Sequence, residues 1–193
     1  MQSNKPRSSA KQRIIDAAFE PFFMHGYEAA SLSHLANIVG IRKATIYTHF
    51  ANKKALFLEL LQDALELECA FLRNCFATAS DLSGPGDIYC HAFKERYDSA
   101  VTLRFLIRMA YASPVHLTDT IASIFNVYID VLVEQMALAL QPYNLSSEQL
   151  EIYTDAYVGV IDSLSVELLY AEALYERRLK AMLMLYQNAI RQL

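Results

Sequence analysis

The sequence predicts an all-α protein of about nine helices, in which a small N-terminal unit precedes a larger helical one. Apolar residues recur at helical spacing (i, i+3, i+4 and i+7) along nearly all of its 193 residues. There are only 5 Gly and 5 Pro, which disfavours a turn-rich β fold. A hydrophobic content of 54% with 20% charged residues excludes a disordered chain.

The front of the chain predicts a flexible basic arm, residues 1–8, followed by a helix that Ser8 or Ser9 can cap. An apolar stripe predicts its buried side: Ile14, Ile15, Ala18, Phe19, Phe22 and Phe23. Pro21 predicts a kink or a helix that starts again, because proline inside a helix loses a hydrogen bond and costs about 3 kcal/mol. Gly26 is expected to end this helix, since glycine accepts the left-handed C-terminal conformation.

Two short helices and a long one come next. The second helix starts at Ser31 and buries Leu32, Leu35, Ala36 and Val39, and Gly40 breaks it. A third runs from about Arg42 to Phe50, and Asn52 can cap a fourth over about residues 53–78. Two short helices joined by a tight glycine turn are typical of a helix-turn-helix motif.

The string DLSGPGD, residues 81–87, is the strongest break in the chain, and we interpret it as a simple turn because no phosphate-loop GK[ST] follows. Further helices are predicted over about 87–97, 101–112, 118–140, 147–171 and 174–191. Ser146 and Gln149 predict a capping box for the fourth of these. The expected division is an arm (1–8), a helix-turn-helix domain (9–51) and a helical domain (52–193), with the fourth helix connecting the last two.

Charge is distributed unevenly along the chain. The formal net charge is −4, yet residues 1–56 hold eight Lys and Arg against three Asp and Glu, a net charge of +5. The remainder therefore carries −9. A basic head on an acidic body suggests that the head alone meets a polyanion.

In a helix-turn-helix motif the second helix lies in the DNA major groove and its flanks hold phosphates. Ile46 and Phe50 are expected to point into the core, and Lys53 to hold a phosphate together with the N–H groups that begin the fourth helix. The predicted DNA-contact set is Ser31, Arg42, Lys43, Ala44, Thr45, Tyr47, Thr48, His49 and Lys53. An ordinary solvated helix face is the competing interpretation, but the coincidence of basic residues with this motif favours DNA.

Residues 13–57, RIIDAAFEPFFMHGYEAASLSHLANIVGIRKATIYTHFANKKALF, resemble the DNA-binding segment of TetR/AcrR-type transcriptional regulators. The matching features are the IIDAA start, the HGY turn, SLSHLA, VGI, ATIYTHF and NKKALF. The resemblance implies a homodimer that binds a partly palindromic operator, usually to repress, and that a small molecule releases from DNA. Two positions depart from the pattern: Arg42 stands where a Ser cap is common, and Pro21 where a helix former is usual.

The body is expected to bind that effector, and in the resembled family helices five to eight surround a pocket. The predicted ligand-binding residues are Tyr97, Arg104, Phe105, Arg108, Met109, Phe125, Tyr128, Tyr157 and Asp162. Aromatic stripes at helical spacing are more often plain core. Arg104 and Arg108 either receive an acidic ligand or pair with Asp162 or Glu167, and pairing is favoured because buried charges usually have partners.

The last two helices are apolar on more than one face, which predicts two packing partners. One face would serve the core of the chain and the other a second chain, in a four-helix interface. The predicted interface residues are Leu164, Leu168, Leu179, Met182, Leu183, Tyr186 and Ile190.

Several other classes of function and site lack support. Cys69, Cys75 and Cys90 are odd in number and form no CxxC, so we expect buried thiols and neither disulfides nor zinc. The histidines lack metal-ligand spacing, so we expect no metal site. We find no nucleophile–base set or cofactor motif, and therefore expect no cofactor and no enzyme.

The polar N-terminus and the lack of an apolar run of about 18 residues predict neither signal peptide nor membrane span, and hence a cytoplasmic protein. The alternatives left open are an all-helical enzyme or carrier without DNA binding, and a DNA-binding head on a purely structural dimerisation body.

Overall fold

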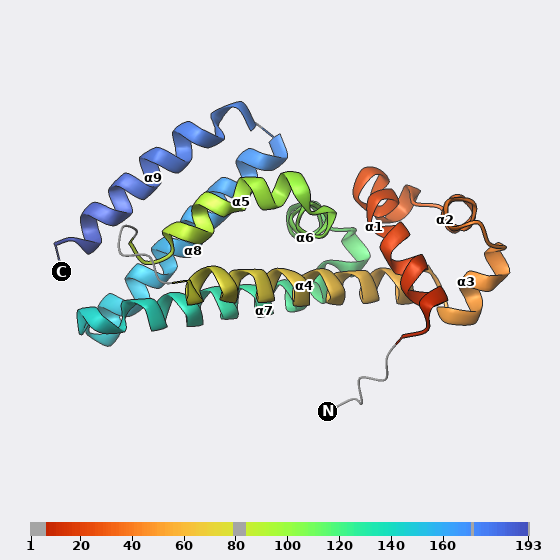
Figure 1. Ribbon diagram of the computed structural model, residues 1–193, viewed down its shortest axis with the longest axis horizontal. Helices are drawn as coiled ribbons and strands as arrows, with labels where there is room; N and C mark the ends of the chain where they lie inside the picture. The colour runs from red at the N-terminus through yellow and green to blue at the C-terminus, as the bar shows by residue number, and fades with distance from the viewer. Residues whose placement is uncertain (1–6, 79–83, 171, 193) are drawn as a thin grey trace.

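The computed structural model describes residues 7–78, 84–170 and 172–192, and these residues form an all-α fold, as the sequence predicts (Figure 1). The α-helices are α1 (Ser9–Ala29), α2 (Leu32–Val39), α3 (Lys43–His49), α4 (Lys53–Ala77), α5 (Asp87–Ser99), α6 (Val101–Tyr111), α7 (Thr118–Leu140), α8 (Ser147–Tyr170) and α9 (Tyr175–Ile190). Short 3-10 turns cover Val115–Leu117, Gln141–Tyr143 and Glu172–Leu174. The predicted boundaries of α2 to α9 agree within two residues; most of the predicted 81–87 turn lies outside the described residues.

Side-chain caps fix several of these helix starts. The hydroxyls of Ser8 and Ser31 accept from the third backbone N–H of α1 and of α2. The side-chain oxygen of Asn52 accepts from Ala55 N at 2.8 Å. At the start of α8, Gln149 N donates to the Ser146 hydroxyl and Gln149 Oε1 accepts from Ser146 N, which confirms the capping box.

The break in α1 falls at Gly26, whereas the sequence also predicts a kink at Pro21. Pro21 is buried within the helix, and Gly26 alone leaves helical geometry, with φ 71° and ψ 177°. A residue with a β-carbon is strained at this φ, and glycine is not, so the chain turns there. The helix then continues for one further turn to Ala29.

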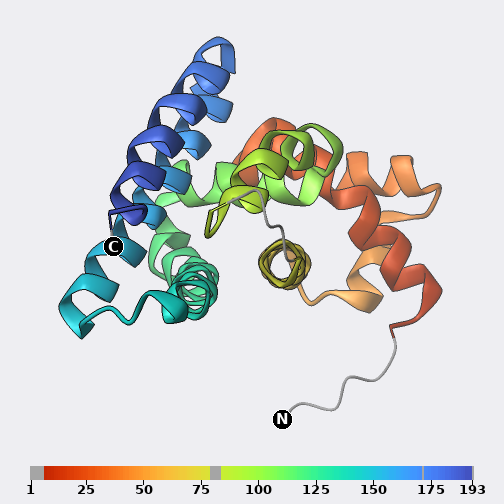
Figure 2. The same ribbon diagram turned by 60° about the vertical axis from the view of Figure 1, so that its left-hand side comes forward.

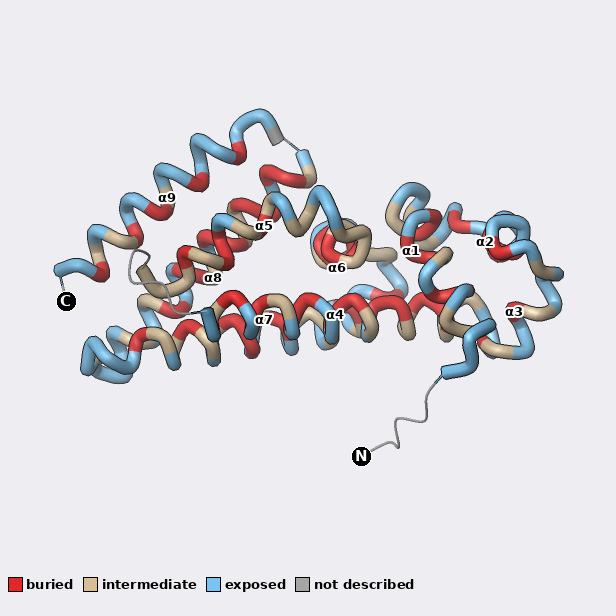
Figure 3. Tube along the Cα trace, in the orientation of Figure 1, coloured by how far each residue is buried: buried red, intermediate tan, exposed pale blue. Residues whose placement is uncertain are grey.

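Helices α1 to α3 form a head at one end of the molecule, and α9 lies at the opposite end (Figure 1). Helix α4 leaves the head and runs along the body side by side with α7, and both are seen nearly end-on in Figure 2. Buried residues follow one side of α4 over much of its length (Figure 3). This long helix therefore joins the head to the body.

Two hydrophobic clusters make up the core. The first contains α1 to α3 and the first half of α4, together with Phe105, Leu106 and Met109 of α6 and Ile121 of α7. The second lies among α4, α5, α7, α8 and α9. The core of the head thus extends past residue 51, where the sequence places the domain boundary, and includes part of α6.

The stretch Val115–Tyr143, which contains α7, has a mean hydropathy of 1.4 and is long and apolar enough to cross a membrane by length and composition. This differs from the expectation that no apolar run is long enough for a membrane span. Tyr128, Leu132 and Met136 of this helix are buried in the second cluster. In this fold the apolar side of α7 therefore packs against the rest of the body.

Candidate nucleic-acid interface

Helix α3 presents the predicted polar side chains on one face. Arg42, Lys43, Ala44, Tyr47 and Thr48 are exposed, and Thr45 and His49 are half-buried. On the opposite side Ile46 is fully buried and Phe50 is 3% exposed, so both point into the core as predicted. Helix packing therefore leaves the basic and hydroxyl groups free to meet a ligand.

The turn between α2 and α3 is fixed by main-chain bonds. Gly40 adopts φ 73° and ψ 36°, and its N–H donates to Asn37 O at 3.2 Å. The N–H of Ile41 donates to Ala36 O at 2.9 Å. A residue other than glycine would be strained at Gly40. These bonds set the direction in which α3 leaves the turn.

Arg13 of α1 also holds this turn. Its Nη2 donates to the main-chain oxygen of Val39, the last residue of α2, at 3.0 Å. The carbonyls that end a helix lack partners within the helix, so a cation placed there is favourable. Sequence reasoning missed this contact, since 26 residues separate the two groups.

Arg42 occupies the N-cap position of α3, and its side chain makes no capping hydrogen bond. The helix therefore begins one residue later than the sequence predicts. The Thr48 hydroxyl donates a hydrogen bond to the main-chain oxygen of Thr45 at 2.7 Å. The Arg42 guanidinium and the Lys43 ammonium form no ion pair within the part of the chain that the structure describes.

The sequence predicts that Lys53 holds a phosphate, but its ammonium already makes contacts within the chain. Its Nζ donates to Glu28 O at 3.0 Å and lies 4.8 Å from the centre of the Tyr27 ring. Burial lowers the pKa of the Lys53 ammonium, and the Glu28 carboxylate acts in the opposite direction. An ammonium has three N–H donors, so a phosphate contact remains open to this side chain.

The described part of the predicted basic arm folds back on the body. Arg7 donates to both carboxylate oxygens of Asp63 and lies 2.9 Å from a Glu59 oxygen. Lys11 lies 2.8 Å from the same Glu59. Residues 1–6 of the arm lie outside the described residues. Arg7 is thus bound to carboxylates of α4, whereas the sequence predicts that it belongs to a flexible arm.

Several predicted ligand-binding residues instead join α6 to α1. The Phe105 ring packs edge-on against Phe19, with ring centroids 5.5 Å apart. Met109 lies in the same hydrophobic cluster, which is the core of the head. The guanidinium groups of Arg104 and Arg108 lie 5.2 Å and 5.9 Å from the centre of the Phe23 ring. These four side chains therefore pack toward α1 of the head.

The predicted partners of the two arginines are likewise corrected. Arg104 Nη2 lies 3.6 Å from a Glu20 oxygen. Asp162 accepts a 3.0 Å hydrogen bond from the Tyr111 hydroxyl, and Glu167 pairs with Arg178 at 2.7 Å. The expected pairing with Asp162 or Glu167 is therefore wrong, because both arginines lie over the Phe23 ring of α1.

The other predicted ligand-binding aromatics are packed in the body. Tyr128 and Tyr157 are buried in the second cluster, where the Tyr128 hydroxyl bonds that of Tyr89. Phe125 packs against Tyr128 with ring centroids 5.4 Å apart, and Tyr97 is half-buried beside the same cluster. These side chains behave as core in this structure, which is the competing interpretation of their spacing.

The predicted dimer residues need a similar correction. Leu164, Leu168, Leu179, Leu183 and Ile190 are at most 5% exposed inside the second cluster of a single chain. Their side chains are therefore unavailable to a second chain. Met182 and Tyr186 line an outer apolar groove of about 400 Å³ between α8 and α9, although Tyr186 is only 6% exposed. The other lining residues are Ile152, Tyr153, Ala156, Val160, Leu185 and Ala189.

The family model described as bacterial regulatory proteins of the tetR family matches residues 14–60. The match spans α1 to α3 and the start of α4, and so includes the whole exposed face of α3. Residues 14–60 of the chain are therefore a tetR-family segment. The resemblance that the sequence predicts is thereby confirmed.

Two curated relatives are HTH-type transcriptional regulators. The chain is 32% identical over 76 residues to the HTH-type transcriptional activator FasR of Mycolicibacterium smegmatis, covering 39% of this chain and 35% of FasR. It is 30% identical over 112 residues to the HTH-type transcriptional repressor AcnR of Corynebacterium diphtheriae, covering 58% of this chain and 56% of AcnR. The chain thus matches about a third to a half of the length of these relatives.

Solved structures resemble the chain over nearly its whole length. The fatty acid degradation regulator FadR from Bacillus halodurans has a TM-score of 0.72 at 21% identity, covering 93% of this chain and 97% of FadR. FadR from Bacillus subtilis, in complex with stearoyl-CoA, has a TM-score of 0.65 at 17% identity, covering 89% and 97%. At these identities the likeness concerns the fold alone, over head and body together.

Proposed function

We propose that the chain is a transcriptional regulator that binds duplex DNA through α3, as a homodimer on a partly palindromic operator. The observation that carries this proposal is the division of α3 into two faces: Ile46 and Phe50 are buried, whereas Arg42, Lys43, Tyr47 and Thr48 are exposed. Helices of this kind enter the major groove with the first residues toward base edges. Base contacts then select the sequence, and cations on the flanks contact phosphates.

The charge distribution supports DNA as the partner of the head. Residues 1–56 carry +5 and the remainder −9. Arg7 and Lys11 are tied to carboxylates, so the cations left for DNA concentrate on α3 and at the start of α4. The proposed contact set remains Ser31, Arg42, Lys43, Ala44, Thr45, Tyr47, Thr48, His49 and Lys53.

A second copy of the chain is the proposed partner of the body. The outer groove of α8 and α9 exposes large apolar side chains, with Ile152 at 59% and Leu185 at 66% exposed. Covering the same groove on two chains by a two-fold axis would bury both at once and build a four-helix interface. A two-fold dimer would also present two α3 helices to the two halves of a palindrome.

We further propose repression in the cytoplasm, relieved by an unidentified small molecule that the body binds. The repressor AcnR supports the first part and the stearoyl-CoA complex of FadR supports the second, each by similarity alone. The relative FasR is an activator, so similarity alone does not distinguish repression from activation. A reporter gene placed downstream of the selected operator distinguishes the two.

Selection of binding sequences from random duplex DNA, followed by fluorescence anisotropy at several salt concentrations, tests the proposal. We expect an enriched inverted repeat and a log–log salt slope of about −0.9 per phosphate neutralised. Lys43→Gln should weaken binding, whereas Arg73→Gln, an exposed cation of α4 outside the head, should not. Absence of salt-dependent binding to any duplex would favour the alternative, an all-helical enzyme or carrier.

A further inference from the structure

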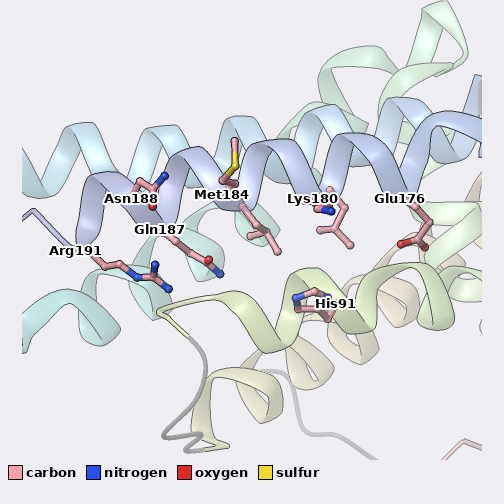
Figure 4. Close-up of a pocket in the computed structure, with 9 residues that line it drawn as sticks. His91, Glu176, Lys180, Met184, Gln187, Asn188 and Arg191 are labelled. Carbon is pink, nitrogen blue, oxygen red and sulfur yellow. The ribbon is translucent and has the colours of Figure 1, made fainter.

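A second groove lies between α5 and α9, away from the head and from the outer groove of α8 and α9. It has a volume of about 520 Å³, which suits a small organic molecule. Leu179 and Leu183 are the most buried of its lining residues, and His91 of α5 faces α9 across it (Figure 4). Lys180, Gln187 and Arg191 line it from α9.

Two cations of this groove have no ion-pair partner among the residues that the structure describes. Lys180 and Arg191 form no ion pair within residues 7–78, 84–170 and 172–192, whereas Arg96 and Arg178 of the same body are paired with Glu68 and Glu167. The part of the chain after residue 56 carries −9. Two unpaired cations that line one groove of an acidic body indicate a site that receives negative charge.

The two ends of the groove differ in charge. Glu176 lines one end and Arg191 the other, 15 residues apart on α9, or about 22 Å along a helix. Beyond Glu176 a second depression adds the carboxylates of Glu95 and Asp98. An anionic group is therefore repelled from the Glu176 end and attracted toward Arg191.

One buried carboxylate lies near the Arg191 end. Asp87 is 4% exposed and accepts hydrogen bonds from Gln187 Nε2 at 2.6 Å and from Gly84 N at 2.9 Å. Gln187 thus stands between Asp87 and the groove and ties α9 to the start of α5. The cations, in contrast, reach the groove directly.

We propose that the groove between α5 and α9 binds an amphipathic organic anion. Its acidic group lies toward Arg191, on the side of Lys180 away from Glu176, and its apolar body covers Leu179 and Leu183. The groove shares no lining residue with the outer groove of α8 and α9, so a dimer built on the latter leaves this site open. The proposal is independent of DNA binding.

Two fluorescent probes with the same apolar body test it: anilinonaphthalene sulfonate, which is anionic, and N-phenylnaphthylamine, which is neutral. Both are titrated into the full-length protein and into a Lys180→Gln, Arg191→Gln double variant. Removing two exposed charge contacts should raise the Kd of the sulfonate roughly tenfold and leave the Kd of the neutral probe unchanged. Arg177→Gln is the matched control, because Arg177 is an exposed cation of α9 that does not line the groove.

Three results would overturn the proposal. The sulfonate could bind the double variant as tightly as the native chain, or both probes could weaken equally. The third is loss of sulfonate binding on Leu185→Ser, which would place the probe in the outer groove of α8 and α9. Circular dichroism melting of each variant verifies the fold, and all three substituted cations are exposed.

Discussion

The ammonium of Lys53 donates a hydrogen bond to the main-chain oxygen of Glu28 at 3.0 Å. The turn at Gly26 makes this contact possible, because it brings Tyr27 and Glu28 from the end of α1 to the first residue of α4. The Tyr27 ring also lies 5.3 Å from that of His116, which precedes α7. Main-chain, cationic and aromatic contacts thus join head and body here, in addition to the packing of α6 on α1.

Lys53→Ala should therefore affect both stability and DNA binding. Loss of the hydrogen bond and of the contact with the Tyr27 ring should lower the free energy of unfolding by about 1–2 kcal/mol in urea denaturation. Anisotropy should show weaker binding to all duplex sequences alike, as for a phosphate contact. Lys54→Ala is the control for stability, since Lys54 is exposed. Equal destabilisation by both variants would contradict the structural role of Lys53.

Tyr47→Ala should reduce operator affinity and leave folding intact. The Tyr47 side chain is 48% exposed on α3, whereas its neighbour Ile46 is fully buried. Ile46→Ala should lower the free energy of unfolding by about 2–5 kcal/mol, as truncations in cores do. Comparison of melting curves with DNA titrations separates the two effects. If Tyr47→Ala melts like Ile46→Ala, the proposed contact face of α3 is wrong.

Gly86→Ala should destabilise the body strongly. Gly86 has φ +80°, and a β-carbon there would lie 2.4 Å from the Tyr157 ring, whose hydroxyl donates to Gly86 O at 2.7 Å. We expect a loss of about 2–4 kcal/mol in urea denaturation, from backbone strain and overpacking together. Gly159→Ala is the contrasting variant, because Gly159 lies within α8 with open space around it and should gain about 0.5–1 kcal/mol. A mild effect at Gly86 would mean that Tyr157 moves aside readily.

Leu185→Glu should convert the proposed dimer to monomer. Leu185 lines the outer groove of α8 and α9 and is 66% exposed in one chain, so the substitution costs the monomer little. A buried, unpaired carboxylate at an apolar interface is strongly unfavourable. Sedimentation velocity at micromolar concentration measures the change. Leu138→Glu, at a 50% exposed site of α7 outside the groove, should leave the dimer intact, and dissociation by both variants alike would place the interface elsewhere.

Stability should fall at alkaline pH. Burial raises the pKa of the Cys90 thiol from 9.0 to about 12, and it also raises the pKa of the Tyr89, Tyr128 and Tyr157 hydroxyls. These groups are protonated in the fold and lose protons more easily once unfolded. Their stabilising effect is therefore complete below pH 9 and is lost as pH rises from about 9 toward 12.

Urea midpoints measured between about pH 8 and about pH 11 should show this decline, and the ultraviolet absorbance of tyrosinate should rise together with unfolding. Tyr128→Phe removes one of the buried hydroxyls and should make the decline shallower. An unchanged midpoint over this range would mean that water reaches these side chains in the folded protein.

Local sequence signals determined much of the head. The spacing of Ile46 and Phe50 predicts which side of α3 is buried, because a helix repeats every 3.6 residues. Asn52 and Gly40 mark helix ends through groups that act within a few residues. Pro21 shows the limit of such signals, since it lies within α1 at helical geometry and the non-helical residue of that helix is Gly26.

The sequence by itself determined the helices, the basic face of α3 and the family of the head, because these depend on short-range periodicity and on motifs of adjacent residues. Only the tertiary structure decided which side chains contact each other across helices. Arg104 lies against Phe23 and Glu20, Lys53 against Glu28, and Leu164 and Leu183 inside one chain. An apolar or charged helix face is equally compatible with several partners, and the choice depends on packing between segments far apart in the chain.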